Sequence, residues 1–493
     1  MIAARRNRAP AAPAPPARPR PDAGFSIVLA VASILVLMTL GLALVSIVVE
    51  DSDLSVNHVR SNQAFYAAHA GVEYAVLKLS ANPGWGGLPS PGKTVGKGSF
   101  WVAPPDAVDE KGNPLPSGQL RVVATGVVGD AKRAIEVHVA PGMITTYVGT
   151  GANGYSGDGG ASTSAQIKNP EGVAVAPNGD LYVADSDNHA IRRVNFLTGV
   201  ITTVAGTGNP GYSGDGAAAT ACKLSFPEDV AVLANGDIYI ADTGNHAIRK
   251  VVAATGTIST IAGTGNPGST GDFGPATAAK LNSPRGIAVA SNGDVYIGDR
   301  SNNKIRKVTA LTGLISTYAG TGTAGFFGDG GLAAAARLKT PQGLHLQTNG
   351  DLYFTDSGNN VVRKIVAITT IITTVAGTGT AGYTGDGGAA TSGRLDAPEA
   401  VHLAPSGDLY ISDTGNHVVR RVLAGSGTIA TIAGTGAAGY AGDGGPATLA
   451  QFNRPRGIAV TTTGTYYISD KNNHRIRKVT GALSVVAWVE TRS

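Results

Sequence analysis

The stretch DSDNHAIRRV, residues 185–194, decides the fold because related decapeptides recur along the chain. Five further copies begin at Asp242, Asp299, Asp356, Asp413 and Asp470, so that successive copies are 57 residues apart with no insertion or deletion. Self-similarity at one fixed period indicates a repeat architecture. Within a chain of 493 residues these six units fill the larger, C-terminal part.

Each unit contains four short segments with the composition of β-strands. In the first unit these are GVAV (172–175), LYVAD (181–185), AIRRV (190–194) and GVITTVAG (199–206). They are rich in β-branched residues and are separated by Gly, Asn and Asp, which form turns. The connections are too short to hold crossover helices, so the strands should pair antiparallel. We therefore predict an all-β fold, a six-bladed β-propeller over residues 141–493.

The motif N-[HN]-x-[IV]-R-[RK], which follows each LYVAD-type strand, resembles the NHL repeat family over residues 143 to about 488. That resemblance implies a propeller of six blades. Segments of the fourth-strand type occur seven times, from MITTYVG (143–149) to LSVVAWV (483–489). Either end segment could complete the last blade and so hide a strand edge.

Polar residues that recur in all six units are expected to build the scaffold, because a catalytic constellation is normally assembled only once. The aspartate and asparagine should fix the turn after the second strand by accepting backbone hydrogen bonds. Contacts between blades are a candidate role for the aspartate and the arginine. The recurring residues are Asp185, Asn188, Arg192, Asp242, Asn245, Arg249, Asp299, Asn302, Arg306, Asp356, Asn359, Arg363, Asp413, Asn416, Arg420, Asp470, Asn473 and Arg477.

Two other polar positions also recur. The residue after the asparagine is His in four units and Asn in two, an exchange that favours a turn residue over a metal ligand. The glycine-rich connection, GTGANGYSGDGG at 149–160 in its first copy, carries an aspartate in every copy. It lacks the Walker lysine and the EF-hand ligand series, so we expect it to form turns.

Function is better sought where the units differ. The residue between a proline and the inner strand is charged in five units and Gln342 in the other, and two cations follow the second strand on the same face. The set is Glu171, Glu228, Arg285, Glu399 and Arg456, with Arg300 and Lys471. We hypothesise that this mixed-charge mouth of the central channel is a ligand or partner face. The alternative is that neighbouring Arg and Glu side chains simply pair around the ring.

The inner strand offers weak candidates for metal ligands. His345 and His402 lie in adjacent units at a position that is Ala in the other four. A catalytic zinc site usually needs three protein ligands and the series has no third histidine, so packing of the two rings is the favoured interpretation. Cys222 is the only cysteine and its equivalents are Ala or Gly, which marks it as a small core residue. No catalytic residue and no cofactor is predicted.

The N-terminal part predicts a membrane anchor. Residues 1–24 are basic and rich in Pro and Ala, and 25–49 carry no charge. At a rise of 1.5 Å per residue these 25 residues make a helix of about 37 Å, enough to cross a bilayer and too long for a secretory signal. The arginines precede the span, so residues 1–24 should face the cytoplasm and the bulk of the chain should be extracytoplasmic.

The anchor also resembles the N-terminal spine of type IV pilin-like proteins, particularly minor pilins. The matching segments are AGFSIVLAV (23–31) and AFYAAHAGVEYAV (64–76), within an expected helix over 25–82. The resemblance implies prepilin cleavage between Gly24 and Phe25. Most pilins carry Glu at the fifth mature position, where this chain has Leu29. An ordinary major-subunit role is therefore disfavoured, and a plain membrane anchor stays as the alternative.

Residues 83–140 should form a small β-rich head or linker. The stretch NPGWGGLPSPGKTVGKG (82–98) is predicted as a loop, and SFWVAP (99–104), QLRVVATGVV (119–128) and RAIEVHV (133–139) as strands. The Gly-Asp pair at 129–130 should turn the last two into a hairpin.

Together these features predict a cell-surface or pilus-associated binding or adhesion module. Its candidate partners are a protein or glycan ligand and other pilin or pilus-assembly subunits. Nucleic acid is not expected, because five arginines and one aspartate in 1–24 supply most of the net charge of +5. The alternative is an extracytoplasmic enzyme, a lyase or lactonase-like hydrolase with a metal in the channel. A third possibility is a structural surface protein without a specific ligand.

Overall fold

The computed structural model describes residues 60–68, 70, 75, 87–95, 98–105, 120–129, 131–140, 142–480 and 484–491. The predicted membrane segment at 25–49 and the cleavage position Gly24–Phe25 lie outside the described residues. Within the described part of the chain, no helix has the length and hydropathy needed to cross a membrane.

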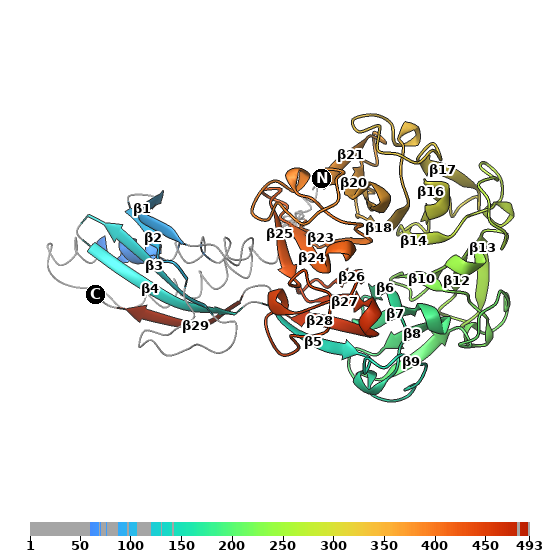
Figure 1. Cartoon of the computed structure of the whole chain (residues 1–493), viewed down its shortest axis with the longest axis horizontal. Helices are drawn as coiled ribbons and strands as arrows, with labels where there is room; N and C mark the ends of the chain where they lie inside the picture. Colours follow the sequence, from blue (N-terminus) through green and yellow to red (C-terminus); the bar gives the residue numbers. More distant parts are fainter. Residues whose placement is uncertain are drawn as a thin grey trace, which may run out of the picture. The chain divides into compact units, whose positions relative to one another are not determined.

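Six antiparallel sheets of four strands each form the blades of a propeller (Figure 1). The predicted strands are confirmed in every unit, and each blade is built from consecutive strands except the last. The blades are β6 (Pro170–Val175), β7 (Leu181–Asp185), β8 (Ala190–Val194) and β9 (Ile201–Ala205); β10 (Pro227–Val232), β11 (Ile238–Asp242), β12 (Ala247–Val251) and β13 (Ile258–Ala262); β14 (Pro284–Val289), β15 (Val295–Asp299), β16 (Lys304–Val308) and β17 (Ile315–Ala319); β18 (Pro341–Leu346), β19 (Leu352–Asp356), β20 (Val361–Ile365) and β21 (Ile372–Ala376); β22 (Ala400–Leu403), β23 (Leu409–Asp413), β24 (Val418–Val422) and β25 (Ile429–Ala433); and β26 (Pro455–Val460), β27 (Tyr466–Asp470), β28 (Arg475–Thr480) and β5 (Met143–Val148).

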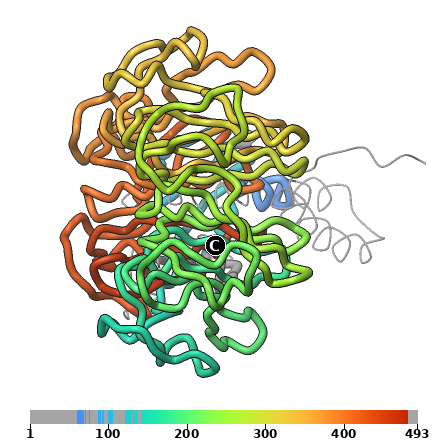
Figure 2. Tube along the Cα trace, turned by 90° about the vertical axis from the view of Figure 1, so that its right-hand side faces the viewer, coloured from blue at the N-terminus to red at the C-terminus, as the bar shows by residue number. Residues whose placement is uncertain are grey.

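The N-terminal end strand closes the ring. β5 pairs antiparallel with β28, with Ile144 opposite Val479, and so supplies the fourth strand of the sixth blade. The other end strand, β29 (Ser484–Thr491), pairs with a strand of the small sheet instead. The range 141–493 predicted for the propeller thus includes one strand that belongs elsewhere. Figure 2 shows the succession of blades from the side, with the first and last blades as neighbours.

The small sheet has the strand order β1 (Leu88–Val95), β2 (Gly98–Val102), β3 (Leu120–Val128), β4 (Ala131–Ala140) and β29. The predicted hairpin between the last two of these strands is confirmed, with Val128 opposite Ala131. β1 lies in a stretch that we predicted as a loop. It is an edge strand whose register shifts between Leu88 and Lys93, which is how a segment with prolines at 89 and 91 can join a sheet. Ala64 and Ala68 of the helical stretch 60–68 are buried.

The hydrophobic core of the propeller lies between adjacent blades. Cys222, for example, is fully buried with Ala205 and Ile191 of the first blade and Ile240 of the second. It is unpaired, and its burial confirms the prediction that it fills core space.

Candidate functional site

The aspartate and arginine that recur in each unit form buried ion pairs within the blade. Arg192 is fully buried, with Nη1 lying 3.3 Å from Asp185 and Nη2 lying 2.6 Å from Asp158 of the preceding connection. The other five units repeat this arrangement. The contacts between blades that we considered for this pair are not what the structure shows. The aspartate of the glycine-rich connection, predicted only to form a turn, is the second partner of the arginine.

Neighbouring blades are tied instead by the position that alternates between His and Asn. These residues adopt left-handed backbone conformations, with φ of 52° at His189 and 53° at Asn303. Each accepts a hydrogen bond from a backbone N–H of the next blade, for example Phe226 to His189 Nδ1 (3.1 Å) and Thr340 to Asn303 Oδ1 (3.0 Å). The ring of six is completed by His246, Asn360, His417 and His474. His and Asn are interchangeable here because each presents one acceptor to the same backbone N–H.

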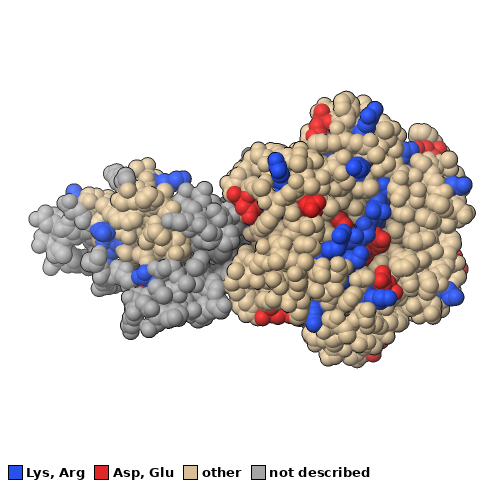
Figure 3. Space-filling view, viewed as in Figure 1, with Lys and Arg blue, Asp and Glu red and all other residues tan. Residues whose placement is uncertain are grey.

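The charged residues that differ between units gather at one mouth of the central channel. They lie at the starts of the six inner strands, and Figure 3 shows Lys, Arg and acidic side chains crowded at a hollow in the centre of this face. The inner-strand members of the set, with Gln342, line a cavity of about 250 Å³ that continues along the channel. The sequence therefore correctly grouped these side chains on one face.

The arginines of the third and sixth blades reach across the mouth. Arg456 pairs with Glu171 and lies 2.6 Å from Glu399, both in neighbouring blades. Arg285 pairs with Glu228 and donates a hydrogen bond to Gln342 (2.6 Å). It also lies 3.7 Å from Glu171 and 3.6 Å from Glu399, so the side chains pair across the axis as well as around the ring.

The two cations that follow the second strands have different surroundings. Lys471 lies 2.9 Å from Glu171. Burial alone would raise the pKa of Glu171, but Arg456, Arg285 and Lys471 together hold it below its usual value. Arg300 has no ion pair with any described carboxylate, and its Nε is buried without a hydrogen-bond partner in the described part of the chain. The pKa of Arg285 falls to about 10 because of burial and the nearby Arg456 and Arg300.

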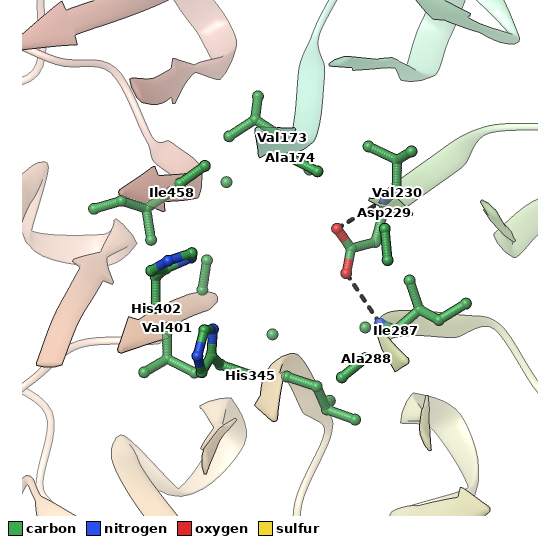
Figure 4. A pocket seen from close by; sticks show the side chains of 18 of the residues that line it. Val173, Ala174, Asp229, Val230, Ile287, Ala288, His345, Val401, His402 and Ile458 are labelled. Atoms are coloured by element: carbon green, nitrogen blue, oxygen red, sulfur yellow. Dashed lines mark hydrogen bonds between the residues drawn. The ribbon is translucent and has the colours of Figure 1, made fainter. Parts of the chain in front are cut away.

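Deeper in the channel, His345 and His402 face its interior from adjacent blades (Figure 4). Their ring centroids are 4.5 Å apart, which confirms that the two rings pack together. Burial lowers the pKa of His345 to about 4 and, with the neighbouring imidazole, holds the pKa of His402 well below 6.5. No group of three His, Cys, Asp or Glu side chains suitable for a metal ion occurs among the described residues.

Asp229 is the channel residue that the sequence analysis missed. Its carboxylate lies on the opposite wall from the two histidines in Figure 4 and accepts hydrogen bonds from the N–H groups of Val230 (2.9 Å) and Ile287 (3.0 Å). Burial raises its pKa to about 7. The equivalent residues in the other units are Gly172, Gly286, Gly343, Ala400 and Gly457. Asp229 directly follows the mouth residue Glu228, so a comparison of the six units at this next position would identify it from sequence.

Comparisons with known proteins agree with this architecture. The NHL repeat model matches residues 168–193, 224–251 and 452–479, and the teneurin NHL domain model matches 251–326. Residues 143–480 form an NHL-repeat propeller. The family expectation for fold is thereby confirmed, while these matches do not reach the N-terminal 142 residues.

Relatives of this NHL-repeat protein are of several kinds. It is 32% identical over 285 residues to Protein SUPPRESSOR OF QUENCHING 1, chloroplastic, of Arabidopsis thaliana, a match covering 55% of this chain and 26% of the relative. It is 29% identical over 290 residues to human NHL repeat-containing protein 2, covering 53% and 40%. The chain thus spans less than half the length of these relatives.

A solved auxiliary nutrient binding protein from Bacteroides ovatus superimposes with a TM-score of 0.51 at 19% identity. The superposition covers 78% of this chain and 94% of the other. At this identity the likeness supports the fold alone.

Proposed function

We propose that this protein is a binding module that presents the charged channel mouth to a ligand outside the cytoplasm, on a membrane-anchored pilin-like stem. The observation that carries the proposal is the concentration of variable charge at this mouth. Six units that agree at their scaffold positions differ in the inner-strand residues around one hollow. Concave sites with converging polar groups are where propellers and other repeat folds offer contacts to ligands.

Binding is tested with the full-length chain in mild detergent on arrays of glycans and surface proteins. The mouth variant carries Arg285→Gln and Arg456→Gln, and we expect it to lose the signals of the wild type. The control variant carries Lys307→Gln and Lys364→Gln, which remove two cations paired with Asp294 (2.8 Å) and Asp351 (2.7 Å) at the opposite ends of the strands. Equal signals from folded mouth and control variants would contradict the proposal.

The proposed stem is tested by N-terminal sequencing of the mature protein from membranes. A start at Phe25 supports prepilin processing, whereas an intact arginine-rich tail favours a plain single-pass anchor. Recovery of the protein in the cytoplasmic fraction would contradict the proposed location.

An enzymatic role is the second candidate, favoured by His345 and His402, which face the channel side by side but are joined by no third metal-binding side chain among the described residues. The activity would be that of a lyase or lactonase-like hydrolase with a metal in the channel. Metal analysis of the purified chain decides between the candidates. Stoichiometric zinc or calcium that disappears in the His345→Ala, His402→Ala variant would favour the enzyme.

A further inference from the structure

The mouth contains two junctions between blades that correspond residue for residue. At the junction of the sixth and first blades stand Arg456, Lys471 and Glu171. Three repeats away, at the junction of the third and fourth blades, the equivalent residues are Arg285, Arg300 and Gln342. The two junctions therefore differ at their acceptor, which is a carboxylate in one and a neutral amide in the other.

At the first junction the carboxylate compensates both cations. Glu171 is 5% exposed, and its two oxygens are divided between Lys471 (2.9 Å) and Arg456. At the second junction the amide oxygen of Gln342 accepts one hydrogen bond from Arg285 (2.6 Å) and brings no negative charge. Arg300, the counterpart of Lys471, has no acidic partner among the described residues.

The surrounding carboxylates do not fill this gap. Glu228 is engaged by Arg285, and Glu399 is shared by Arg456, Arg285 and the rim residue Arg454 (3.5 Å). Five cations thus stand against three glutamates at the mouth. Arg454 lies at the exposed rim beside Glu399, so the mouth cation without a described carboxylate partner is Arg300, at the junction where the acceptor is Gln342.

The presence of Arg300 has no structural explanation of the kind found at equivalent positions. In the second and fifth blades the equivalent Thr243 and Thr414 donate hydrogen bonds to the carbonyls of Pro284 and Pro455 in the next blade (both 2.6 Å). Arg300 lacks that hydroxyl and gains no ion pair in exchange. A guanidinium that has no acidic partner among the described residues and lies near Arg285 of the channel mouth is well suited to a carboxylate or phosphate, which it can bind with two hydrogen bonds.

We propose that the junction of the third and fourth blades is an oxyanion-binding subsite, in which a carboxylate or phosphate group of the ligand binds Arg300 and supplies the negative charge that Glu171 supplies at the other junction. This inference rests on the proposed function, because it names the chemistry of the ligand. It extends the proposal from a general charged mouth to one defined junction.

The test is calorimetric titration of the full-length chain in mild detergent with sodium phosphate and with sodium acetate, at low ionic strength and with sodium chloride as the reference. We expect one saturable site per chain. Two variants should weaken it at least about tenfold, since charge-assisted hydrogen bonds are roughly twice as strong as neutral ones. Arg300→Ser removes the cation and uses a residue found at this position in other blades. Gln342→Glu keeps every cation but adds a carboxylate that would pair with Arg300 in place of the ligand anion.

Control variants distinguish the subsite from general charge effects. Lys307→Gln, at the opposite ends of the strands, should bind as the wild type does. Glu171→Gln should create a second site at the junction of the sixth and first blades. Wild-type affinity in folded Arg300→Ser and Gln342→Glu, or an equal loss in Lys307→Gln, would overturn the inference. The ratio of phosphate to acetate affinity identifies which group the ligand carries.

The outcomes separate this inference from the proposed function. Anion binding that follows these variants, without any ligand on the arrays, would leave the subsite standing and contradict the binding module. Array ligands that require Arg285 and Arg456, without anion binding at Arg300, would support the binding module and contradict the oxyanion subsite.

Discussion

The replacement of Arg249 by Met should destabilise the propeller far more than the loss of its second partner. Arg249 is fully buried, with Asp242 at 3.2 Å and Asp215 at 2.6 Å. Its removal leaves Asp242, also fully buried, without a cation. Breaking a buried pair from one side typically costs about 3–5 kcal/mol of folding free energy.

Asp215→Asn is the matched comparison. The Asp215 side chain is 51% exposed, and the amide oxygen of Asn can still accept a hydrogen bond from Arg249, which keeps Asp242. An ion pair with one solvent-exposed member typically contributes about 0–1 kcal/mol. Both variants remove one charge from the same cluster. The difference between their losses of folding free energy therefore measures the cost of leaving the buried Asp242 without its cation.

The assay is thermal unfolding of the full-length chain, followed by circular dichroism. With roughly 2–4 °C per kcal/mol for a domain of this size class, we expect the melting temperature to fall by roughly 6–20 °C in Arg249→Met and by about 4 °C or less in Asp215→Asn. Equal shifts in the two variants would refute the reasoning that burial sets the cost.

The pH dependence gives an independent check. Burial raises the pKa of Asp242 to about 6 even with its hydrogen bonds and Arg249 in place, and removal of the arginine should raise it further. A folded-state pKa above the unfolded value of 3.8 means that the native state takes up a proton as the pH falls. The penalty of Arg249→Met should therefore be largest near pH 8 and smaller near pH 5. A penalty that does not change with pH would contradict this account.

Three further predictions concern the scaffold. Burial lowers the pKa of four histidines below 6.5, namely His189, His246, His417 and His474. The free energy of unfolding should therefore decrease as the pH falls below about 6.5, by about 1 kcal/mol for each hydrogen bond that is lost. Replacing all four by Asn, as in the third and fourth blades, should remove that loss when melting curves at pH 7.5 and 5.0 are compared with those of the wild type. Deletion of 143–148 should unfold the sixth blade, because β5 pairs with β28, whereas deletion of 484–491 should leave the blades intact. Amide hydrogen exchange in β28 should therefore become faster in the first deletion and stay unchanged in the second. Gly286→Ala would place a methyl group against the carbonyl of Gln342 and should destabilise by about 1–3 kcal/mol, while Gly425→Ala, which has open space, should melt as the wild type does.

The sequence predicts the fold well because a fixed period leaves few alternatives. Strands, turns and blade number all follow from comparing the copies. The choice of closing strand does not follow from strand composition, because MITTYV and SVVAWV both suit a fourth strand. The structure supplies the reason: only the first runs on into the glycine-rich connection, whose Gly149 N–H donates to the Ser162 carbonyl as Gly206 donates to Ala219 in the next unit.

The candidate site is predicted less completely, because partners depend on side-chain reach. Sequence places Arg285 and Arg456 at one mouth, but it does not show that Arg285 comes within 3.7 Å of Glu171 two blades away. Asp229 is hard to predict as a site residue from sequence because its position is glycine in four of the other five units and alanine in the fifth, which gives no sign of polar chemistry there. In the sequence Gln342 is one member of a variable series, and its lack of charge gains meaning only when the structure places the cations of both junctions beside Gln342 and Glu171.

The repeated polar contacts of the scaffold lie apart from the variable charges of the channel mouth. Each buried arginine pairs with aspartates of its own unit and of the preceding connection, and neutral His or Asn acceptors tie the blades to one another. Neither interaction uses the first residues of the inner strands. Those residues also pair between blades, as Arg456 does with Glu171, but they stand outside the repeated scaffold and differ in charge from blade to blade. Differences between nearly equal units are therefore the guide to the ligand that we propose.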